Sequence, residues 1–438
     1  MPISQTPAYN LKVVLKETGI AADTLRAWER RYGLPMPERT PGGHRLYSQH
    51  DIELVKWLLA RQAEGLSISR AVNMWNEQTA SGADPLADLA ITPQAMIASL
   101  ANTSLDALRA DWIAACLKFN ETTAEQTLNQ AFSMFPVESV CMDVLQKGLV
   151  EIGVLWYENH ANVQQEHFAS ALAMRRLDAL LAASPAASRK QTVIVGCPPD
   201  EWHAFTSLLL ALLLRRRGLN VIYLGANVPN EQFAETAASV HADLVILVAQ
   251  TLVTAATLQQ VARTLTSQGV RTALGGRIFN IHPSILESIP AYFLGPSLIE
   301  SLDEVDRLLE LEVEDIAAQA EPISQEYAAA HQFFTSKRTE IELTLRKLIQ
   351  PLSISAEGLM SGILHLGNNI AAALQLGNME YVTGEMEWLK ALTESRERPT
   401  QEIKTFMENY ASAVKQHING SGRPIYEWLA SEVDKLQQ

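Results

Sequence analysis

The stretch that decides the fold is QTVIVGCPPDEWH, residues 191–203. Its nearly unbroken apolar run at 192–197 predicts a strand that is covered on both faces, as in a parallel sheet. The prolines that follow predict a loop, and residues 202–217 predict a helix. His203 would therefore lie beyond the carboxyl end of a strand, where doubly wound α/β domains bind their ligands.

His203 has two interpretations. Imidazole is a good ligand for transition metals, so this side chain is a candidate axial ligand. A histidine in such a loop can also cap a helix or lie on the surface. The residue alone leaves both interpretations open.

The same strand and helix rhythm continues to about residue 305. Strands are predicted at 192–197, 220–224, 243–248, 272–274 and 292–294, with helices at 202–217, 231–240 and 254–268 between them. This alternation is typical of a flavodoxin-like, doubly wound parallel sheet, here at 190–305. The loops hold neither a Walker lysine nor a G-x-G-x-x-G motif, so nucleoside triphosphates and dinucleotides are not expected.

Residues 92–185 indicate a helical bundle, with helices at 93–101, 104–120, 123–135, 139 to about 156, and 163–181. Such a bundle can be a simple dimerisation module. It also contains WYENHANVQQEH, residues 156–167, which places Glu166 and His167 near Trp156. These polar groups either have partners beside a buried aromatic ring or mark a helix start that faces solvent.

The N-terminal residues 1–78 have helix-turn-helix spacing, with helices at 11–16 and 21–31 around a turn at 17–20. Leu25 and Trp28 are expected to face inward, and Asp51 to cap a further helix. Residues 39–47 predict a wing, because Gly42 and Gly43 permit a tight hairpin between basic and aromatic residues. Such a pattern suits DNA, although a helical hairpin that binds protein has the same spacing.

Charge and composition limit the class of protein and the segment that can contact nucleic acid. The chain has 438 residues, is 47% apolar and 19% charged, and carries a net charge of −14, as expected of about three soluble domains. Residues 1–78 hold ten basic and eight acidic residues, so this segment is +2 and the remainder −16. The N-terminal segment is thus the one that tolerates a phosphate backbone.

Targeting and redox signals point to the cytoplasm. The longest apolar run, 208–214, is far shorter than the ~20 residues that span a bilayer, and no signal peptide is recognisable. No membrane partner is therefore expected. Cys116, Cys141 and Cys197 lack paired spacing, so we expect buried thiols rather than disulfides or a zinc site.

LRAWERRYGL at 25–34 and GGHRLY at 42–47 resemble the MerR family of winged-helix transcription regulators. The resemblance implies that residues 1–78 bind double-stranded promoter DNA. The side chains that it places at the DNA are Thr24, Arg26, Arg30, Arg31, His44, Arg45 and Tyr47.

The bundle, the Glu201-Trp202-His203 motif and Gly275-Gly276 resemble the cobalamin-binding module of the CarH-type light-sensing repressors, whose domain order matches residues 1 to about 300. The resemblance implies a cobalamin, most readily adenosylcobalamin, with His203 as the lower axial ligand of cobalt and Glu201 as a partner for its imidazole. Gly275 and Gly276 would admit the nucleotide tail. The side chains implied over the upper face of the corrin are Trp156, Val163, Glu166 and His167.

Three positions depart from that family. Thr206 replaces the glycine that closes the histidine motif, Gln250 lies in a segment that replaces the usual serine loop, and Tyr157 replaces a histidine that captures cobalt after photolysis. His160 is the nearby substitute for that histidine. Thr206 and Gln250 leave open a regulator whose corrin pocket is degenerate and which responds to another small molecule or a protein partner.

Residues 322–438 predict a C-terminal helical extension, with helices at 332–348, 355–376, 379–394, 400–417 and 424–436. It is either an oligomerisation or packing bundle, or a second sensory module with His365 and Trp388 near a pocket.

The leading hypothesis is a multidomain α and α/β protein without enzymatic activity. It would be a transcription regulator whose oligomeric state, dimer or tetramer, depends on a corrinoid and so controls binding to a palindromic promoter. The resemblance also implies a response to light, in which loss of the adenosyl group from adenosylcobalamin would change the assembly. A corrinoid carrier protein of a methyltransferase is a second alternative, although it would not need a winged helix.

Overall fold

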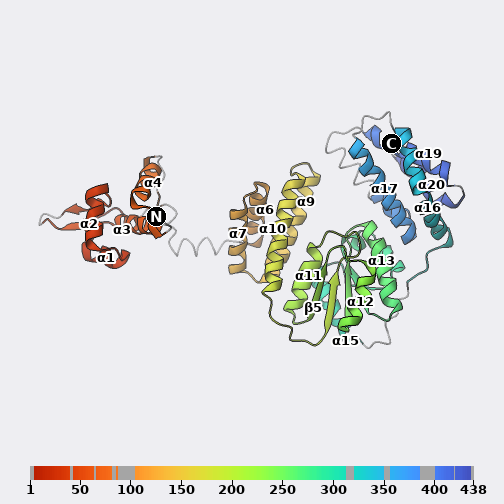
Figure 1. Ribbon diagram of the computed structural model, residues 1–438, viewed down its shortest axis with the longest axis horizontal. Coiled ribbons are helices and arrows are strands. Elements are labelled where there is room, and N and C mark those ends of the chain that lie inside the picture. Colours follow the sequence, from red (N-terminus) through yellow and green to blue (C-terminus); the bar gives the residue numbers. More distant parts are fainter. Residues whose placement is uncertain are drawn as a thin grey trace. The chain divides into compact units, whose positions relative to one another are not determined.

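The computed structural model describes residues 4–39, 43–63, 66–80, 85–86, 104–311, 320–349, 356–384, 400–418 and 420–435. The chain divides into two units, Met1–Ser104 and Leu105–Gln438. Figure 1 shows the helices and strands of each unit.

The N-terminal unit is a winged helix-turn-helix. Its elements are β1 (Tyr9–Asn10), α1 (Leu11–Thr18), α2 (Ala22–Tyr32), β2 (Glu38–Arg39), β3 (Arg45–Tyr47), α3 (Gln49–Ala63) and α4 (Ile68–Ala80). The strands form an antiparallel sheet in the order β1-β3-β2, and β2 and β3 are the arms of the predicted wing. Leu25 and Trp28 are buried, as predicted. Gly42 lies outside the described residues.

Two details of this unit correct the sequence prediction. The residue before α3 is Ser48, whose hydroxyl accepts a hydrogen bond from the Asp51 amide at 3.1 Å, while the Asp51 carboxylate accepts from the Ser48 amide at 2.8 Å. Ser48 is therefore the cap and Asp51 its reciprocal partner. Leu86, eight residues beyond the predicted end of this domain at residue 78, is fully buried in the core of this unit.

The bundle comprises α6 (Leu105–Leu117), α7 (Glu121–Met134), α8 (Val137–Ser139), a π-helix at Val140–Gln146, α9 (Lys147–Tyr157) and α10 (Val163–Ala182). The predicted helix at 93–101 lies outside the described residues. A continuous helical path from 137 to 157 places Trp156 at the end of α9, and a short turn then leads to Val163 at the start of α10. The two segments of the WYENHANVQQEH stretch thus lie at neighbouring helix ends.

The sheet has five parallel strands in the order β5-β4-β6-β7-β8, which confirms the predicted flavodoxin-like plan. The strands are β4 (Thr192–Gly196), β5 (Asn220–Gly225), β6 (Leu244–Val248), β7 (Thr272–Gly275) and β8 (Tyr292–Phe293). Alternate strand residues enter different cores: Val193 and Val195 face one core, while Ile194 faces the other. This alternation follows from the two-residue period of a strand.

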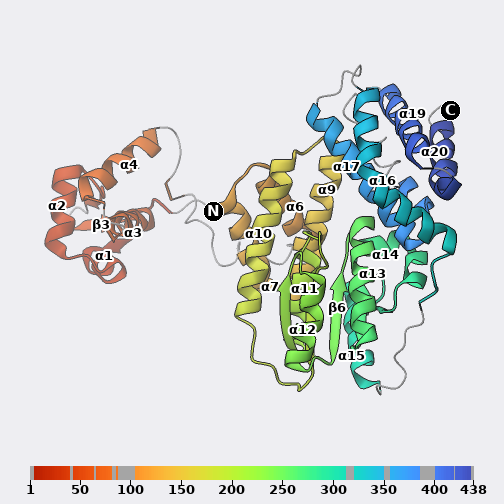
Figure 2. The same cartoon turned by 45° about the vertical axis from the view of Figure 1, so that its right-hand side comes forward.

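One helix joins the bundle to the sheet. In α11 (Phe205–Arg216) every residue from Ser207 to Leu214 is buried. A helix that is apolar all round must be covered on every side. It packs on β4 and β5 on one side and on α10 on the other, and Figure 2 shows α10 and α11 side by side.

The other face of the sheet carries α12 (Asn230–Val240) and α13 (Leu252–Ser267). Two elements after β7 were not predicted: α14 (Arg277–Ile281) and a 3₁₀ helix at Pro283–Ser288. The acidic stretch that starts at Ser301 is helical in its first ten residues. It belongs to α15 (Leu298–Glu310), whose Leu302, Val305 and Leu308 are buried in the bundle-side core.

The C-terminal extension is helical, as predicted, with α16 (Gln325–Ile349), α17 (Ala356–Leu376), α19 (Thr400–His417) and α20 (Arg423–Lys435). Its apolar core is continuous with that of α13, and Gln375 of α17 donates to the carbonyl of Ala256 at 2.7 Å. Figure 2 shows these helices beside α13 and α14. His365 is exposed rather than in a pocket, and Trp388 lies outside the described residues.

Two further observations bear on composition. Cys116, Cys141 and Cys197 are free and buried, as predicted, and burial raises the pKa of the Cys197 thiol to about 11. Among the helices of the described segments, none has the length and apolar character that a bilayer span requires.

Candidate functional site

The loop after β4 holds His203 outside the helix that was predicted to include it. Helix α11 begins at Phe205, three residues later than expected. The reason is a local turn, because the His203 amide donates to Glu201 Oε1 at 2.9 Å and Asp200 has a φ of +67°. The loop therefore presents His203 from an irregular backbone at the carboxyl edge of the sheet.

Glu201 is the centre of this loop. Its side chain is 0% exposed, and each carboxylate oxygen accepts two hydrogen bonds. Oε1 accepts from the His203 amide and ring, and Oε2 accepts from the Gln250 amide at 2.7 Å and the Thr254 hydroxyl at 2.6 Å. Burial alone would raise the pKa of this carboxyl, but the hydrogen bonds from His203, Thr254 and Gln250 lower it overall. The buried charge is thus fully satisfied.

The imidazole of His203 is held by one nitrogen only. Nδ1 lies 2.8 Å from Glu201 Oε1, while the side chain remains 71% exposed. The hydrogen bond to Glu201 raises the pKa of His203, and the nearby Glu166 carboxylate acts in the same direction. In the neutral ring, a proton on Nδ1 that is donated to the carboxylate leaves the Nε2 lone pair available to a metal.

The loop after β7 approaches the loop after β6 closely. Gly276 has a φ of +127°, and a Cβ at this position would lie 1.9 Å from the carbonyl oxygen of Ala249, so a side chain is excluded. A Cβ at Gly275, in contrast, would meet nothing within 4 Å. The Gln250 side chain fixes the two loops further, because its Oε1 accepts from the Arg277 amide at 3.1 Å.

The residues that the resemblance places over the upper face of a corrin lie at the ends of α9 and α10. Asn162 and Gln165 form a capping box that starts α10, and Gln165 also donates to the Leu117 carbonyl at 2.6 Å. Glu166 accepts from the Ser170 hydroxyl and contacts His167 Nδ1, both at 2.7 Å. Val163 is 43% exposed, the His167 side chain is 75% exposed, and Trp156 is half-buried.

The structure brings the histidine loop after β4 and the residues at the ends of α9 and α10 together in part. The charge of Glu166 acts on the imidazole of His203, which places the start of α10 within electrostatic range of the loop after β4. His160 follows α9 in a turn, with Nδ1 3.4 Å from the Glu158 carboxylate and a side chain that is 68% exposed. Thr206 is half-buried in the first turn of α11.

Sequence reasoning missed three participants. Thr254 and the amide of Gln250 satisfy Glu201 from across the sheet, and Arg277 acts on His203 electrostatically. A hydroxyl on the first turn of α13 carries no motif of its own, so no sequence signal could have identified Thr254. Arg277 directly follows Gly275-Gly276, and that position was a signal that could have been used.

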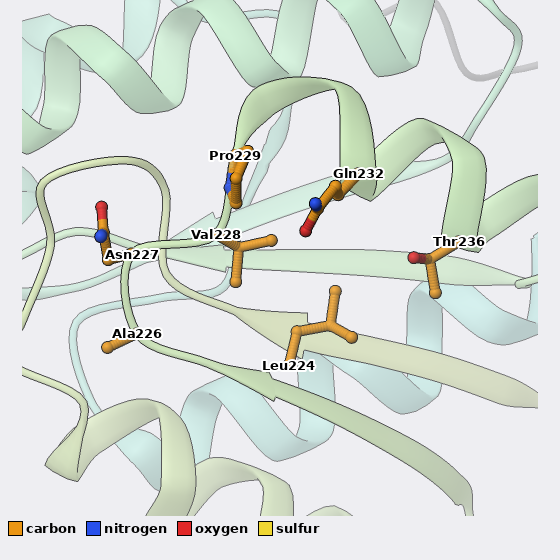
Figure 3. Close-up of a pocket in the computed structure, with 7 residues that line it drawn as sticks. All are labelled: Leu224, Ala226, Asn227, Val228, Pro229, Gln232 and Thr236. Carbon is orange, nitrogen blue, oxygen red and sulfur yellow. The ribbon is translucent and has the colours of Figure 1, made fainter.

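A small hollow lies beside this edge of the sheet, between β5 and the start of α12 (Figure 3). Its volume is about 220 Å³, below the 300–1,000 Å³ usual for ligand sites. The residues that line it are Leu224, Ala226, Asn227, Val228, Pro229, Gln232 and Thr236. Asn227 also supports the histidine loop, since its Oδ1 accepts from the Asp200 amide at 2.8 Å.

The N-terminal unit exposes most of the residues predicted to contact DNA. Thr24, Arg26, Arg30 and Arg31 on α2, and His44 at the wing, are exposed. Tyr47 is a correction, because its side chain is 0% exposed and its hydroxyl donates to Glu29 Oε1 at 2.5 Å.

Arg45 is partly engaged by the same acid, with Nε 2.8 Å from Glu29 Oε2. Tyr47, the aromatic residue of the GGHRLY motif, packs in the core of the N-terminal unit. Its burial and its hydrogen bond to Glu29 raise the pKa of the phenol.

Comparison with known proteins gives the following matches. The family described as MerR HTH family regulatory protein matches residues 9–78, and two families described as B12 binding domain match residues 108–181 and 191–296. The chain is similar to the HTH-type transcriptional repressor CarA of Myxococcus xanthus, with 32% identity over 240 residues that cover 54% of this chain and 75% of CarA.

The HTH-type transcriptional repressor CarH of the same organism is 27% identical over 290 residues, which cover 65% of this chain and 94% of CarH. Among solved structures, the monomethylamine corrinoid protein of Methanosarcina barkeri matches 47% of this chain and 97% of its own, with 18% identity and a TM-score of 0.40.

Proposed function

We propose, from the premise that this chain belongs to the family of HTH-type transcriptional repressors that contains CarA and CarH, that it is a DNA-binding transcription regulator controlled by a corrinoid. The corrinoid is a cobalamin, with adenosylcobalamin as the form that the upper residues would accommodate. The observation that carries the proposal is the imidazole of His203, held at Nδ1 by a fully buried carboxylate and open at Nε2.

The residues present fit a cobalamin. His203 offers a single nitrogen ligand whose orientation is fixed by Glu201, as an axial ligand requires. The open space above Gly275 and the close approach at Gly276 suit the entry of a nucleotide tail. On the other side, Trp156 and Val163 offer an indole and an isopropyl group, which suit the apolar face of a corrin.

Each group would have a separate task. His203 would bind cobalt through Nε2, Glu201 would keep the proton on Nδ1, and Trp156 would pack against the upper alkyl group. Glu166 and His167 would contact that group through their polar atoms. When bound, adenosylcobalamin supplies a cobalt–carbon bond that light can break.

Loss of the upper group would remove the contact that holds Trp156 and the ends of α9 and α10 in place. We propose that this change alters the assembly of the chain into dimers or tetramers. The recognition helix α2 would then bind a palindromic promoter tightly only in the state that pairs two such helices about one turn of DNA apart. Light as the signal is part of this proposal.

The test uses the full chain, incubated in the dark with adenosylcobalamin and then separated from free ligand by gel filtration. We expect a coloured protein whose mass, measured by light scattering, and whose promoter binding change after exposure to green light. A protein that stays colourless with every common corrinoid overturns the corrinoid part. A coloured protein with the same mass and DNA binding in dark and light overturns the light and assembly parts.

A further inference from the structure

The loops at the carboxyl edge of the sheet contain one basic side chain other than histidine. These loops comprise residues 197–204, 226–229, 249–251, 276–280 and 294–297, all within the described part of the chain, and Arg277 is the sole lysine or arginine among them. Its side chain is exposed, and no ion pair within the described residues includes it. In the same domain Arg216, Arg217 and Arg307 each pair with an acid. Arg215 and Arg271 instead donate to backbone carbonyls.

A chain of hydrogen bonds ties the Arg277 backbone to the loop that holds His203. The Arg277 amide donates to Gln250 Oε1 at 3.1 Å, the Gln250 amide donates to Glu201 Oε2 at 2.7 Å, and Glu201 Oε1 contacts His203 Nδ1 at 2.8 Å. The close contact between Gly276 and Ala249 holds the same backbone from the other side.

The Arg277 backbone is therefore joined to the loop of the candidate cobalt ligand through Gln250 and Glu201, and it follows the open space at Gly275 by two residues. The peripheral side chains of a cobalamin are neutral amides, and its negative group is the phosphodiester in the nucleotide tail. A guanidinium pairs with phosphate oxygens through two parallel hydrogen bonds. An arginine without an acidic partner at the tail entrance is thus complementary to that one charge.

We propose that Arg277 binds the phosphodiester of the nucleotide tail and makes the site selective for corrinoids that carry a complete tail. This inference rests on the corrinoid proposal above and adds the chemical class of ligand that the site prefers. It assigns a function to a residue that belongs to neither the histidine motif nor the glycine pair.

The experiment compares cobalamin with cobinamide, which has the same corrin ring but lacks the nucleotide and its phosphodiester. Dissociation constants for both are measured by absorbance titration on the full chain and on Arg277→Gln. We expect Arg277→Gln to weaken cobalamin binding roughly ten- to hundredfold, as the loss of a hydrogen bond to a charged group does. Cobinamide binding should change by less than about twofold, within the effect of a distant surface substitution.

Two further variants complete the design. Arg277→Lys keeps the charge without the bidentate geometry, so it should recover part of the preference for cobalamin. Arg263→Gln is the matched control, because Arg263 is also exposed but lies about three turns along α13 from its first residue. Added salt should weaken cobalamin binding to the wild type more than to Arg277→Gln.

The outcomes separate the two proposals. A wild type that binds neither corrinoid overturns the corrinoid function and this inference with it. A wild type that binds cobalamin, together with an Arg277→Gln variant that keeps the same ratio between the two corrinoids, overturns only the role of Arg277. The role is overturned whether both affinities are unchanged or both fall equally, since equal losses indicate a structural role.

Discussion

The two walls of the candidate site are built in different ways. The lower wall is the loop of Glu201 and His203, where a carboxylate with no exposure accepts four hydrogen bonds from three residues. The upper wall consists of exposed or half-buried side chains at the ends of α9 and α10, and the Glu166 carboxylate is bonded within its own helix. The lower wall is therefore preorganised, whereas the upper wall is free to follow its ligand.

This difference suggests a division of labour between affinity and response. Groups held by a buried network bind with little loss of conformational entropy, so the lower wall should dominate retention of the corrinoid. Groups without such a network change position readily, so the upper wall should dominate the response to the upper ligand. The following variants test this division.

The largest effect is expected from His203→Ala, which removes the proposed metal ligand itself. Cobalamin affinity should fall by about 100-fold or more, since loss of a partner of a ligand alone costs about 10–100-fold. Absorbance titration measures the loss. His167→Ala is the control on the opposite wall and should cost less than about tenfold. Equal losses for the two histidines would contradict the division.

Glu201→Gln should have the next largest effect. The amide has nearly the shape of the carboxylate, but it carries two hydrogens and would meet donors from Thr254 and Gln250. We expect cobalamin affinity to fall about 10–100-fold, together with a loss of stability of about 1–3 kcal/mol in a denaturant titration. The control is Glu300→Gln, which changes an exposed acid at the start of α15. A variant with wild-type affinity would show that the carboxylate does not orient His203.

Trp156→Ala tests the upper wall. Retention of cobalamin should fall by less than about tenfold, because only one side chain of an adaptable surface is removed. The change of mass that we propose between dark and light should nevertheless disappear. Light scattering in both states measures this, with Tyr157→Phe as the neighbouring control. A Trp156→Ala protein that still changes its assembly would place the response elsewhere.

The smallest effect is expected from Thr206→Gly, which restores the residue found in the related motif. If Thr206 crowds the nucleotide tail, cobalamin affinity should rise by about two- to fivefold while cobinamide affinity stays constant, an effect of under about 1 kcal/mol. Thr206→Ser, which removes one methyl group, should give a smaller change in the same direction. A loss of cobalamin affinity in Thr206→Gly would mean that the threonine contributes to the pocket.

Much of the fold could be predicted from local patterns. The apolar run at 192–197, the buried helix at 208–214 and the wing motif at 42–47 each reveal an element through the pattern of its own residues. Periodicity reports burial directly, so the five strands and most helices were predicted. Short elements such as α14, and the buried role of Tyr47, lacked a periodic signal of their own.

The amino-acid sequence by itself determined the order of the domains, the parallel sheet and the position of His203 at its carboxyl edge, because each follows from local apolar spacing and turn chemistry. Only the tertiary structure decided which groups surround that histidine. Thr254, the amide of Gln250 and Arg277 come from segments that are 49 to 74 residues away from Glu201 or His203 in the chain. No local pattern specifies such a meeting, since it arises from the parallel alignment of β4, β6 and β7.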